Sequence, residues 1–111
     1  MENPFIVLSG QQLSSVVFVQ DYLQLDFDGH TITCYDWPMV TLSDSKFVKN
    51  DKEYRNALCS LIANKVDGAS FIEEERLSIN FQTGEKIEID LRNANGEVIY
   101  FTTPDGEWSS I

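Results

Sequence analysis

The clearest pattern along the chain begins at Tyr22, where apolar and polar residues alternate with the period of two that is typical of a β-strand. The dipeptide Asp28-Gly29 follows and favours a tight hairpin turn, because both central residues of a type I′ turn need positive φ. Alternation resumes over residues 31–35, so the two segments predict an antiparallel hairpin. Its apolar face carries Leu23, Leu25, Phe27, Ile32 and Cys34.

Residues 13–20 precede this hairpin and are rich in β-branched side chains, with apolar residues on both faces. Such a run is typical of a strand that is covered on both sides. We therefore predict that residues 13–20 form the most buried strand of a three-stranded meander, whose other strands are residues 22–27 and 31–35.

A second set of segments repeats this arrangement. Its predicted strands are residues 66–73, 76–81 and 86–91, with Thr83-Gly84 at the second turn. Residues 8–35 and 61–90 align if one residue is added at each of two turns, where insertions are best tolerated. We interpret this as a duplicated folding unit. The matched pairs are Leu8/Leu61, Phe18/Phe71, Leu23/Leu77, Phe27/Phe81, Gly29/Gly84 and Ile32/Ile87.

One helix is predicted between the copies, over residues 51–63. Asn50 can cap it, Glu53 can reach back to complete the cap, and Asn64 can end it in the left-handed conformation. One apolar stripe with helical spacing supports this prediction: Tyr54, Ala57, Leu58, Leu61 and Ile62.

The remaining segments are short. Residues 41–49, after Trp37-Pro38, have the composition of a loop, and Asn95-Gly96 marks a turn into a seventh strand over residues 98–102. We therefore expect an α+β fold in a single domain, residues 1–111. Two duplicated three-stranded antiparallel meanders and the seventh strand would form one curved sheet or a partly closed barrel, with the single helix covering its apolar face.

The net charge of −10 is unevenly distributed. Residues 1–45 contain six acids and no Lys or Arg, residues 46–65 contain five bases, and residues 66–111 contain ten acids and three bases. A negative field repels nucleic acid and anionic lipid and attracts basic proteins. No apolar run approaches the length of a membrane span and the N-terminus lacks a basic signal region, so we expect a cytoplasmic protein without nucleic-acid or membrane partners.

Few residues are suited to catalysis or metal binding. Cys34 and Cys59 lie at predicted core positions and favour small buried hydrophobes, with a disulfide between them as the alternative. His30, the single histidine, follows a turn, and the run Glu73–Glu75 has the composition of a solvated turn. Asp26 and Asp28 lack the further ligands of a calcium loop. We therefore predict no catalytic residues, no metal and no cofactor.

Several segments resemble a family of small uncharacterised bacterial proteins. The resemblance rests on Asp-Tyr-Leu-Gln-Leu-Asp-Phe-Asp-Gly at 21–29, Trp37-Pro38, Leu-Cys-Ser-Leu-Ile at 58–62, and residues 96–108. It covers most of the chain and implies a bacterial, single-domain α+β protein, without an activity to carry over. Such relatives have Gly after the Leu-Ile pair, whereas this chain has Ala63, so the resemblance implies a helix end at Asn64.

Aromatic residues outside the predicted core suggest where a partner binds. Tyr22 and Tyr35 lie on outward strand faces, Trp37 and Trp108 lie beyond strands, and Asp26 adds charge to the Tyr22 face. Exposed aromatics among acids suit a protein interface. We therefore predict that Tyr22, Tyr35, Trp37 and Asp26 bind a protein partner; a second packing layer over these aromatics is the alternative.

Three function classes follow from these observations. The first is a non-enzymatic acidic protein-binding module, of the immunity type or a regulatory partner of a basic protein. The second is a homo-oligomeric structural or small-ligand-binding module, in which a homodimer covers the open sheet edges. The third is a small hydrolase or isomerase based on carboxylates, which would use His30 or Glu74.

Overall fold

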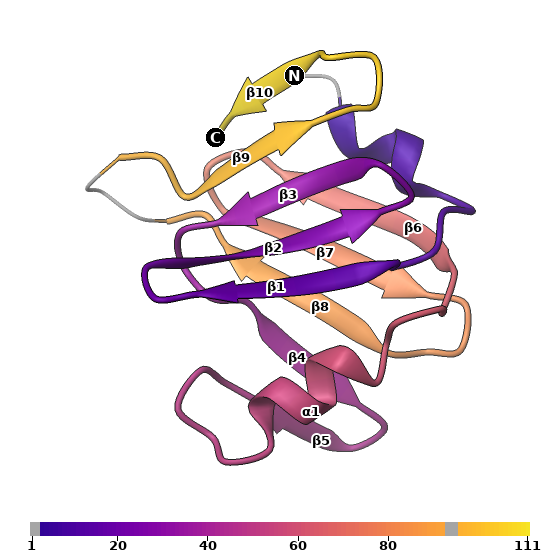
Figure 1. The fold of residues 1–111 in the computed structure, drawn as a ribbon, viewed down its shortest axis with the longest axis vertical. Helices are drawn as coiled ribbons and strands as arrows, with labels where there is room; N and C mark the ends of the chain where they lie inside the picture. Colours follow the sequence, from indigo (N-terminus) through magenta and orange to yellow (C-terminus); the bar gives the residue numbers. More distant parts are fainter. Residues whose placement is uncertain (1–2, 93–95) are drawn as a thin grey trace.

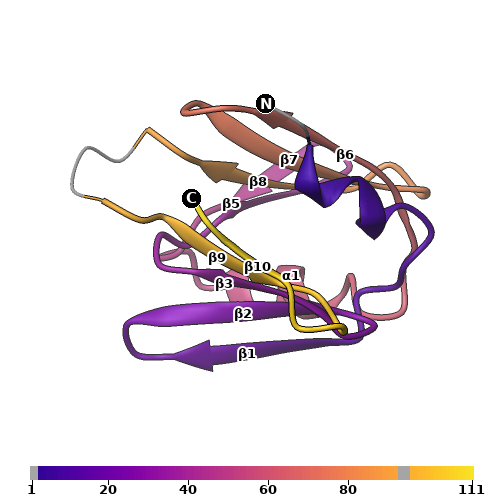
Figure 2. The same ribbon diagram turned by 90° about the horizontal axis from the view of Figure 1, so that it is seen from above.

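The computed structural model describes residues 3–92 and 96–111, which contain two antiparallel five-stranded sheets stacked face to face (Figure 1; Figure 2). Sheet I has the order β1-β2-β3-β9-β10, formed by Ser15–Val19, Tyr22–Phe27, His30–Cys34, Ile99–Thr102 and Trp108–Ser110. Sheet II has the order β5-β4-β8-β7-β6, formed by Ser45–Phe47, Met39–Leu42, Lys86–Asp90, Arg76–Phe81 and Val66–Ile72. A 3-10 helix, η1 (Pro4–Leu8), and a short α-helix, α1 (Tyr54–Cys59), accompany them.

Both predicted meanders are present, as β1-β2-β3 and β6-β7-β8. Their registers place the predicted apolar faces opposite one another, with Leu25 paired to Ile32 in sheet I and Ile79 paired to Ile87 in sheet II. All four side chains are buried between the sheets. The period-two pattern therefore determines which face of each meander enters the core.

Two separate sheets replace the single curved or partly closed sheet that we expected. The hairpin β4-β5 follows the first meander in the chain but pairs with β8, and β9-β10 follows the second meander but pairs with β3. Each half of the chain thus gives its hairpin to the sheet of the other half. The broader α+β description fits, although the strands dominate and the described residues contain one short α-helix.

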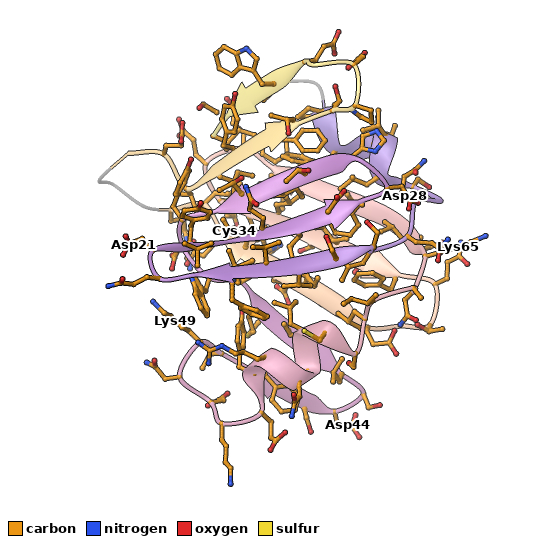
Figure 3. All side chains as sticks on the ribbon, in the orientation of Figure 1. Asp21, Asp28, Cys34, Asp44, Lys49 and Lys65 are labelled. Carbon is orange, nitrogen blue, oxygen red and sulfur yellow. The ribbon has the colours of Figure 1, made fainter. Side chains whose placement is uncertain are left out.

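The segments that lead into the two meanders cross each other and pair at Gln12 and Lys65. Gly10 N–H donates to Val66 O over 2.8 Å, and Ala63 N–H donates to Leu13 O over 2.7 Å. The two bonds are equivalent under a shift of 53 positions, in which Gly10 corresponds to Ala63 and Leu13 corresponds to Val66. Two further bonds, Leu13 N–H to Asn64 O and Val66 N–H to Gln11 O, are related in the same way. This crossing is therefore locally two-fold symmetric, on the side of the molecule where Figure 3 labels Lys65 and Asp28.

Strand β1 is an edge strand of sheet I, so the prediction of a most buried strand at residues 13–20 is wrong. Val16 and Phe18 pack against the core, but Val17 on the opposite face is 45 % exposed. Leu13, whose burial is complete, belongs to the crossing segment rather than to the strand. The inner apolar side chains of β1 therefore pack on the core, whereas no described element covers Val17 on the outer face.

Residues 41–49 are not a loop, because β4 and β5 form a hairpin there. Val40 pairs with Phe47 across the hairpin and with Ile87 of β8, and its side chain is buried. The turn places Ser43 at a φ of 51°, a left-handed conformation for which the sequence offers no glycine. Strand β10 was likewise not predicted, and Asn95 of the predicted turn lies outside the described residues.

Helix α1 spans six residues, which is shorter than the predicted 51–63. Neither Asn50 nor Glu53 provides the predicted cap: Glu53 is the N-cap residue without a side-chain cap bond. The apolar stripe is largely buried as predicted, and Tyr54 anchors it by donating its hydroxyl to Pro38 O over 2.5 Å. Instead of covering a sheet face, α1 packs beside β4 and the edge strand β1.

The left-handed residue after α1 is Ala63, at a φ of 79°, and not the predicted Asn64. Gly10 has a φ of 84° at the matching position of the crossing. A side chain in this conformation costs about 1–2 kcal/mol, which glycine avoids. Ala63→Gly should therefore stabilise the protein by about 0.5–1 kcal/mol after the greater backbone entropy of glycine is included.

Urea unfolding followed by circular dichroism would measure this change. Ala57→Gly is the matched control, because Ala57 lies inside α1 and the same replacement there should destabilise by about 1 kcal/mol or more. Equal destabilisation by both replacements would contradict the proposed strain at Ala63.

The segment η1 closes the core at the end of the sandwich beside β6 (Figure 2). Asn3 caps it, because the Asn3 side chain accepts the Phe5 N–H over 2.9 Å and donates to Ala69 O of β6. The Phe5 ring is fully buried. Its centroid lies 5.3 Å from the ring centroid of Phe71 in sheet II and 4.8 Å from that of Phe101 in sheet I. Phe5 therefore joins the two layers.

The two cysteines differ in environment, and both are free. Cys34 is buried as predicted, and burial raises the pKa of its thiol well above the ordinary value. Cys59 is exposed on α1, so the prediction that it lies in the core is wrong. Neither described helix is long and apolar enough to span a membrane.

Candidate protein-binding face

The outer face of sheet I carries two pairs of aromatic rings. Tyr22 on β2 and Tyr35 just after β3 lie with their centroids 6.3 Å apart in an edge-on arrangement. Tyr100 on β9 and Trp108 on β10 are stacked at 5.8 Å. Trp108 is 64 % exposed and Tyr35 is 43 % exposed. We call these four residues the aromatic face.

The register of sheet I explains why these side chains point outward. Leu23, Leu25 and Phe27 enter the core, so Tyr22 with the opposite parity faces solvent. Tyr100 pairs with Thr33 on one side and Ser110 on the other, which keeps it on this outer face. Partial burial of the Tyr35 hydroxyl, followed by the nearby Glu97 carboxylate, raises the pKa of Tyr35, so this side chain stays a neutral hydrogen-bonding group.

Sheet I is built entirely from acidic segments. Residues 11–36 and 96–111 contain its five strands, seven acids and no Lys or Arg, so they account for seven of the ten net negative charges. Figure 3 labels two of these acids, Asp21 and Asp28, at opposite ends of the sheet. The aromatic face therefore lies within a negative field, and the strands that carry it contain no Lys or Arg.

Asp26 faces the same side as Tyr22 but lies four residues along β2, about 13 Å away. Its carboxylate accepts the Gly29 N–H over 2.7 Å and so stabilises the β2–β3 turn. Asp28 accepts the Gln12 N–H over 2.9 Å, which ties this turn to the crossing segment. Asp26 therefore contributes charge at the margin of the aromatic face rather than a central contact.

Trp37 is not part of the aromatic face. Its ring stacks on Tyr54 at 6.0 Å and lies 5.8 Å from Phe18, and both of these residues pack on the inner side of sheet I. Lys49 Nζ lies 4.8 Å from the Trp37 ring centroid and the Arg55 guanidinium lies 5.6 Å from it. The structure thus brings Tyr22 and Tyr35 together and places Trp37 in a separate cluster beside α1.

Tyr100 is the contact residue that sequence reasoning missed. The alternation of residues 98–102 places Tyr100 on the outward face of the strand. Its stacking partner Trp108 becomes a neighbour only through the β9–β10 hairpin. The turn Pro104-Asp105-Gly106 before Trp108 was the available signal for that hairpin.

A cleft of about 330 Å³ lies beside Trp37, with Met39, Arg76, Glu88, Asp90 and Arg92 among its walls. Four acids and two bases line it: Asp36, Glu75, Glu88, Asp90, Arg76 and Arg92. Arg92 Nη2 lies 2.9 Å from Asp90 Oδ2, and Glu88 Oε1 lies 3.3 Å from Nζ of Lys86, which is not a wall residue. The Arg92 hydrogen bonds lower the pKa of Asp90 to about 2. Because acids and bases both line the cleft, its walls do not select a ligand charge.

The residues considered for acid–base catalysis do not converge. His30 Nδ1 lies 3.1 Å from Phe27 O at the β2–β3 turn, whereas Glu73–Glu75 occupy the β6–β7 turn of the other sheet. Within residues 3–92 and 96–111, no cluster of three His, Cys, Asp or Glu side chains is arranged to hold a metal ion.

Comparison with protein-family models, with curated proteins and with solved structures finds no match to this chain. The aromatic face is therefore the feature from which a function is inferred.

Proposed function

We propose that this protein is a non-enzymatic acidic module that binds a basic protein, as an immunity-type or regulatory partner, through the outer face of sheet I. The observation that carries the proposal is the pairing of Tyr22 with Tyr35 and of Tyr100 with Trp108 on a sheet whose strands contain no Lys or Arg. No other described helix or strand lies over the outer face of sheet I in either ribbon view (Figure 1; Figure 2).

The chemistry of the face supports a basic protein as its ligand. Tyr and Trp are the commonest anchors of protein interfaces, because they bury a large area at a small loss of side-chain entropy. The surrounding acids accelerate the encounter with a positively charged surface and favour it over other partners. The same charge opposes self-association, since two copies would each bring a net charge of −10.

We also infer that the two halves of the chain are copies of one folding unit, supported by the symmetric hydrogen bonds at Gln12 and Lys65. The copies agree at core and turn positions but differ on their outward faces. Tyr22 and Gln24 of β2 correspond to Arg76 and Ser78 of β7 in the alignment of the copies. The first meander therefore contributes Tyr22 and Tyr35 to the proposed face, and the β9-β10 hairpin of the other half completes it with Tyr100 and Trp108.

Affinity capture from an extract of the source organism, repeated at low and high salt, would identify the partner for a direct binding assay. Tyr35→Ala and Trp108→Ala should each weaken the purified complex by about 2 kcal/mol, roughly 30-fold, because they remove central anchors. Raised salt should weaken the native complex further.

Ile72→Ala is the matched control, since Ile72 is an exposed apolar residue of sheet II. It should leave the affinity unchanged, and all three variants should unfold at similar urea concentrations. Failure to capture a basic protein at either salt concentration, or equal affinity of all variants, would refute the proposal.

A further inference from the structure

Strand β1 combines a sequence typical of a buried strand with a position at the edge of sheet I. Its residues are Ser-Val-Val-Phe-Val, with no charge, proline or glycine. Natural proteins usually protect such edges with charged residues, bulges, short strands or a covering element, because an open edge pairs with other chains. Strand β1 has no charged residue or proline, and α1, which packs beside it, forms no backbone hydrogen bond with it.

The hydrogen-bonding pattern shows which backbone groups β1 leaves open. Val19 pairs with Tyr22 across a two-residue turn, so Val19, Val17 and Ser15 direct their backbone groups toward β2. Val16 and Phe18 then direct their N–H and C=O groups away from the sheet. Within the described residues, none of these four groups has a hydrogen-bond partner.

The other three sheet edges are protected. Strand β5 has three residues including Lys46, and β10 has three residues directly after Glu107. Strand β6 has an irregular register between Val66 and Gly68. In addition, Ser9 of the N-terminal segment donates its hydroxyl to Asp67 O of β6 over 2.9 Å. Strand β1 is shorter than β6, but its outward backbone groups are not bonded to any other described segment.

We propose that β1 receives an extended segment of the basic partner as a sixth strand of sheet I. This inference rests on the proposed function and specifies how the partner binds. Backbone hydrogen bonds from Val16 and Phe18 would supply affinity, and alternate side chains would supply specificity. The added strand would extend the outer face on which Tyr22 and Tyr35 lie.

The two faces of β1 require different side chains from that segment. On the outer face, Asp26 lies opposite Ser15 at one end of β1, and Asp21 lies in the turn at the other end. No Lys or Arg lies on the strands of sheet I, so lysine or arginine is favoured beside Val17. On the inner face, the Arg55 guanidinium lies 5.5 Å from the Phe18 ring centroid, which disfavours a second cation and favours an apolar residue. The ligand is thus a strand that alternates basic and apolar residues.

A capped Lys-Val-Lys-Val-Lys peptide provides a defined probe, and amide hydrogen exchange measured by NMR gives a residue-specific readout. In the free protein, the Val16 and Phe18 amides should exchange at least 100-fold faster than those of Val17 and Val19. Millimolar peptide should slow them at least tenfold. The same peptide with N-methylated valines, which cannot pair as a strand, should have no effect.

Slow exchange of Val16 and Phe18 in the free protein would overturn the proposal, because the edge would then be covered already. Absence of protection at β1 with millimolar peptide would overturn it as well. Protection that rises with protein concentration, without peptide, would show that a second copy pairs with β1 instead.

Charge variants at Val17 separate these outcomes further. Val17→Lys should weaken peptide binding at least tenfold, whereas Val17→Glu should retain or strengthen it; pairing of two copies at Val17 would be weakened by both. Ser45→Lys on the β5 edge is the matched control. Binding of the captured partner that depends on Trp108 but is unaffected by Val17→Lys would preserve the proposed function and refute the added strand.

Discussion

Replacement of Phe5 by alanine should lower the free energy of unfolding by about 3–5 kcal/mol, which is a large fraction of the stability of a domain of this size. Phe5 is fully buried and its ring contacts Phe71 of sheet II and Phe101 of sheet I. The neighbouring main chain is held by Asn3 and β6, so the site has little freedom to collapse around the missing ring.

Urea unfolding monitored by fluorescence and circular dichroism would measure this loss. Ile6→Ala is the matched control, because Ile6 lies on the same short helix but is 70 % exposed, and its replacement should change the stability by less than about 0.5 kcal/mol. Similar effects of the two replacements would show that η1 does not close the core.

A cut between Lys49 and Asn50 should leave two fragments that are unfolded alone and fold together when mixed. The first fragment contains β4, whose partner β8 lies in the second, and the second contains β9, whose partner β3 lies in the first. In each fragment alone, the apolar face of the meander would be exposed to water. The meander and the hairpin would each also lack the strand from the other fragment that pairs with it.

Circular dichroism of the separate and mixed fragments, with size-exclusion chromatography of the mixture, would test this exchange of hairpins. Ile32→Asp in the first fragment should prevent reassembly, because Ile32 is buried opposite Phe101 of the second fragment and a charge there would be desolvated. Cooperative unfolding of either fragment alone would contradict the predicted dependence.

Local pattern was sufficient for the two meanders and insufficient for their assembly. The alternation that ends at Phe27 and the Asp28-Gly29 turn determine strand faces and register within a few residues. The pairing of β3 with β9 joins residues that are more than sixty positions apart. The identities of Ile32 and Phe101 do not indicate which strand each of them pairs with. Hairpin β4-β5 escaped prediction because Ser43 occupies a turn conformation that usually signals glycine.

The candidate site was predictable where the strand period still applied. Tyr22 and Tyr35 have the parity opposite to the buried residues, and they do lie together on the outer face. Trp37 follows the end of β3, where the chain leaves the sheet and parity no longer assigns a face, so its position beside Tyr54 could not be anticipated. The edge position of β1 depends on the global strand order, which its own residues do not encode.

The unequal charge of the two sheets affects how a partner approaches before any contact is made. All eight basic residues lie within residues 46–92, outside the segments that build sheet I. The segments of sheet I carry a net charge of −7, whereas those of sheet II, residues 37–47 and 66–92, carry −4. An approaching cationic surface is therefore attracted more strongly to the side of sheet I, so fewer encounters are lost to wrong orientations and the association rate depends on ionic strength.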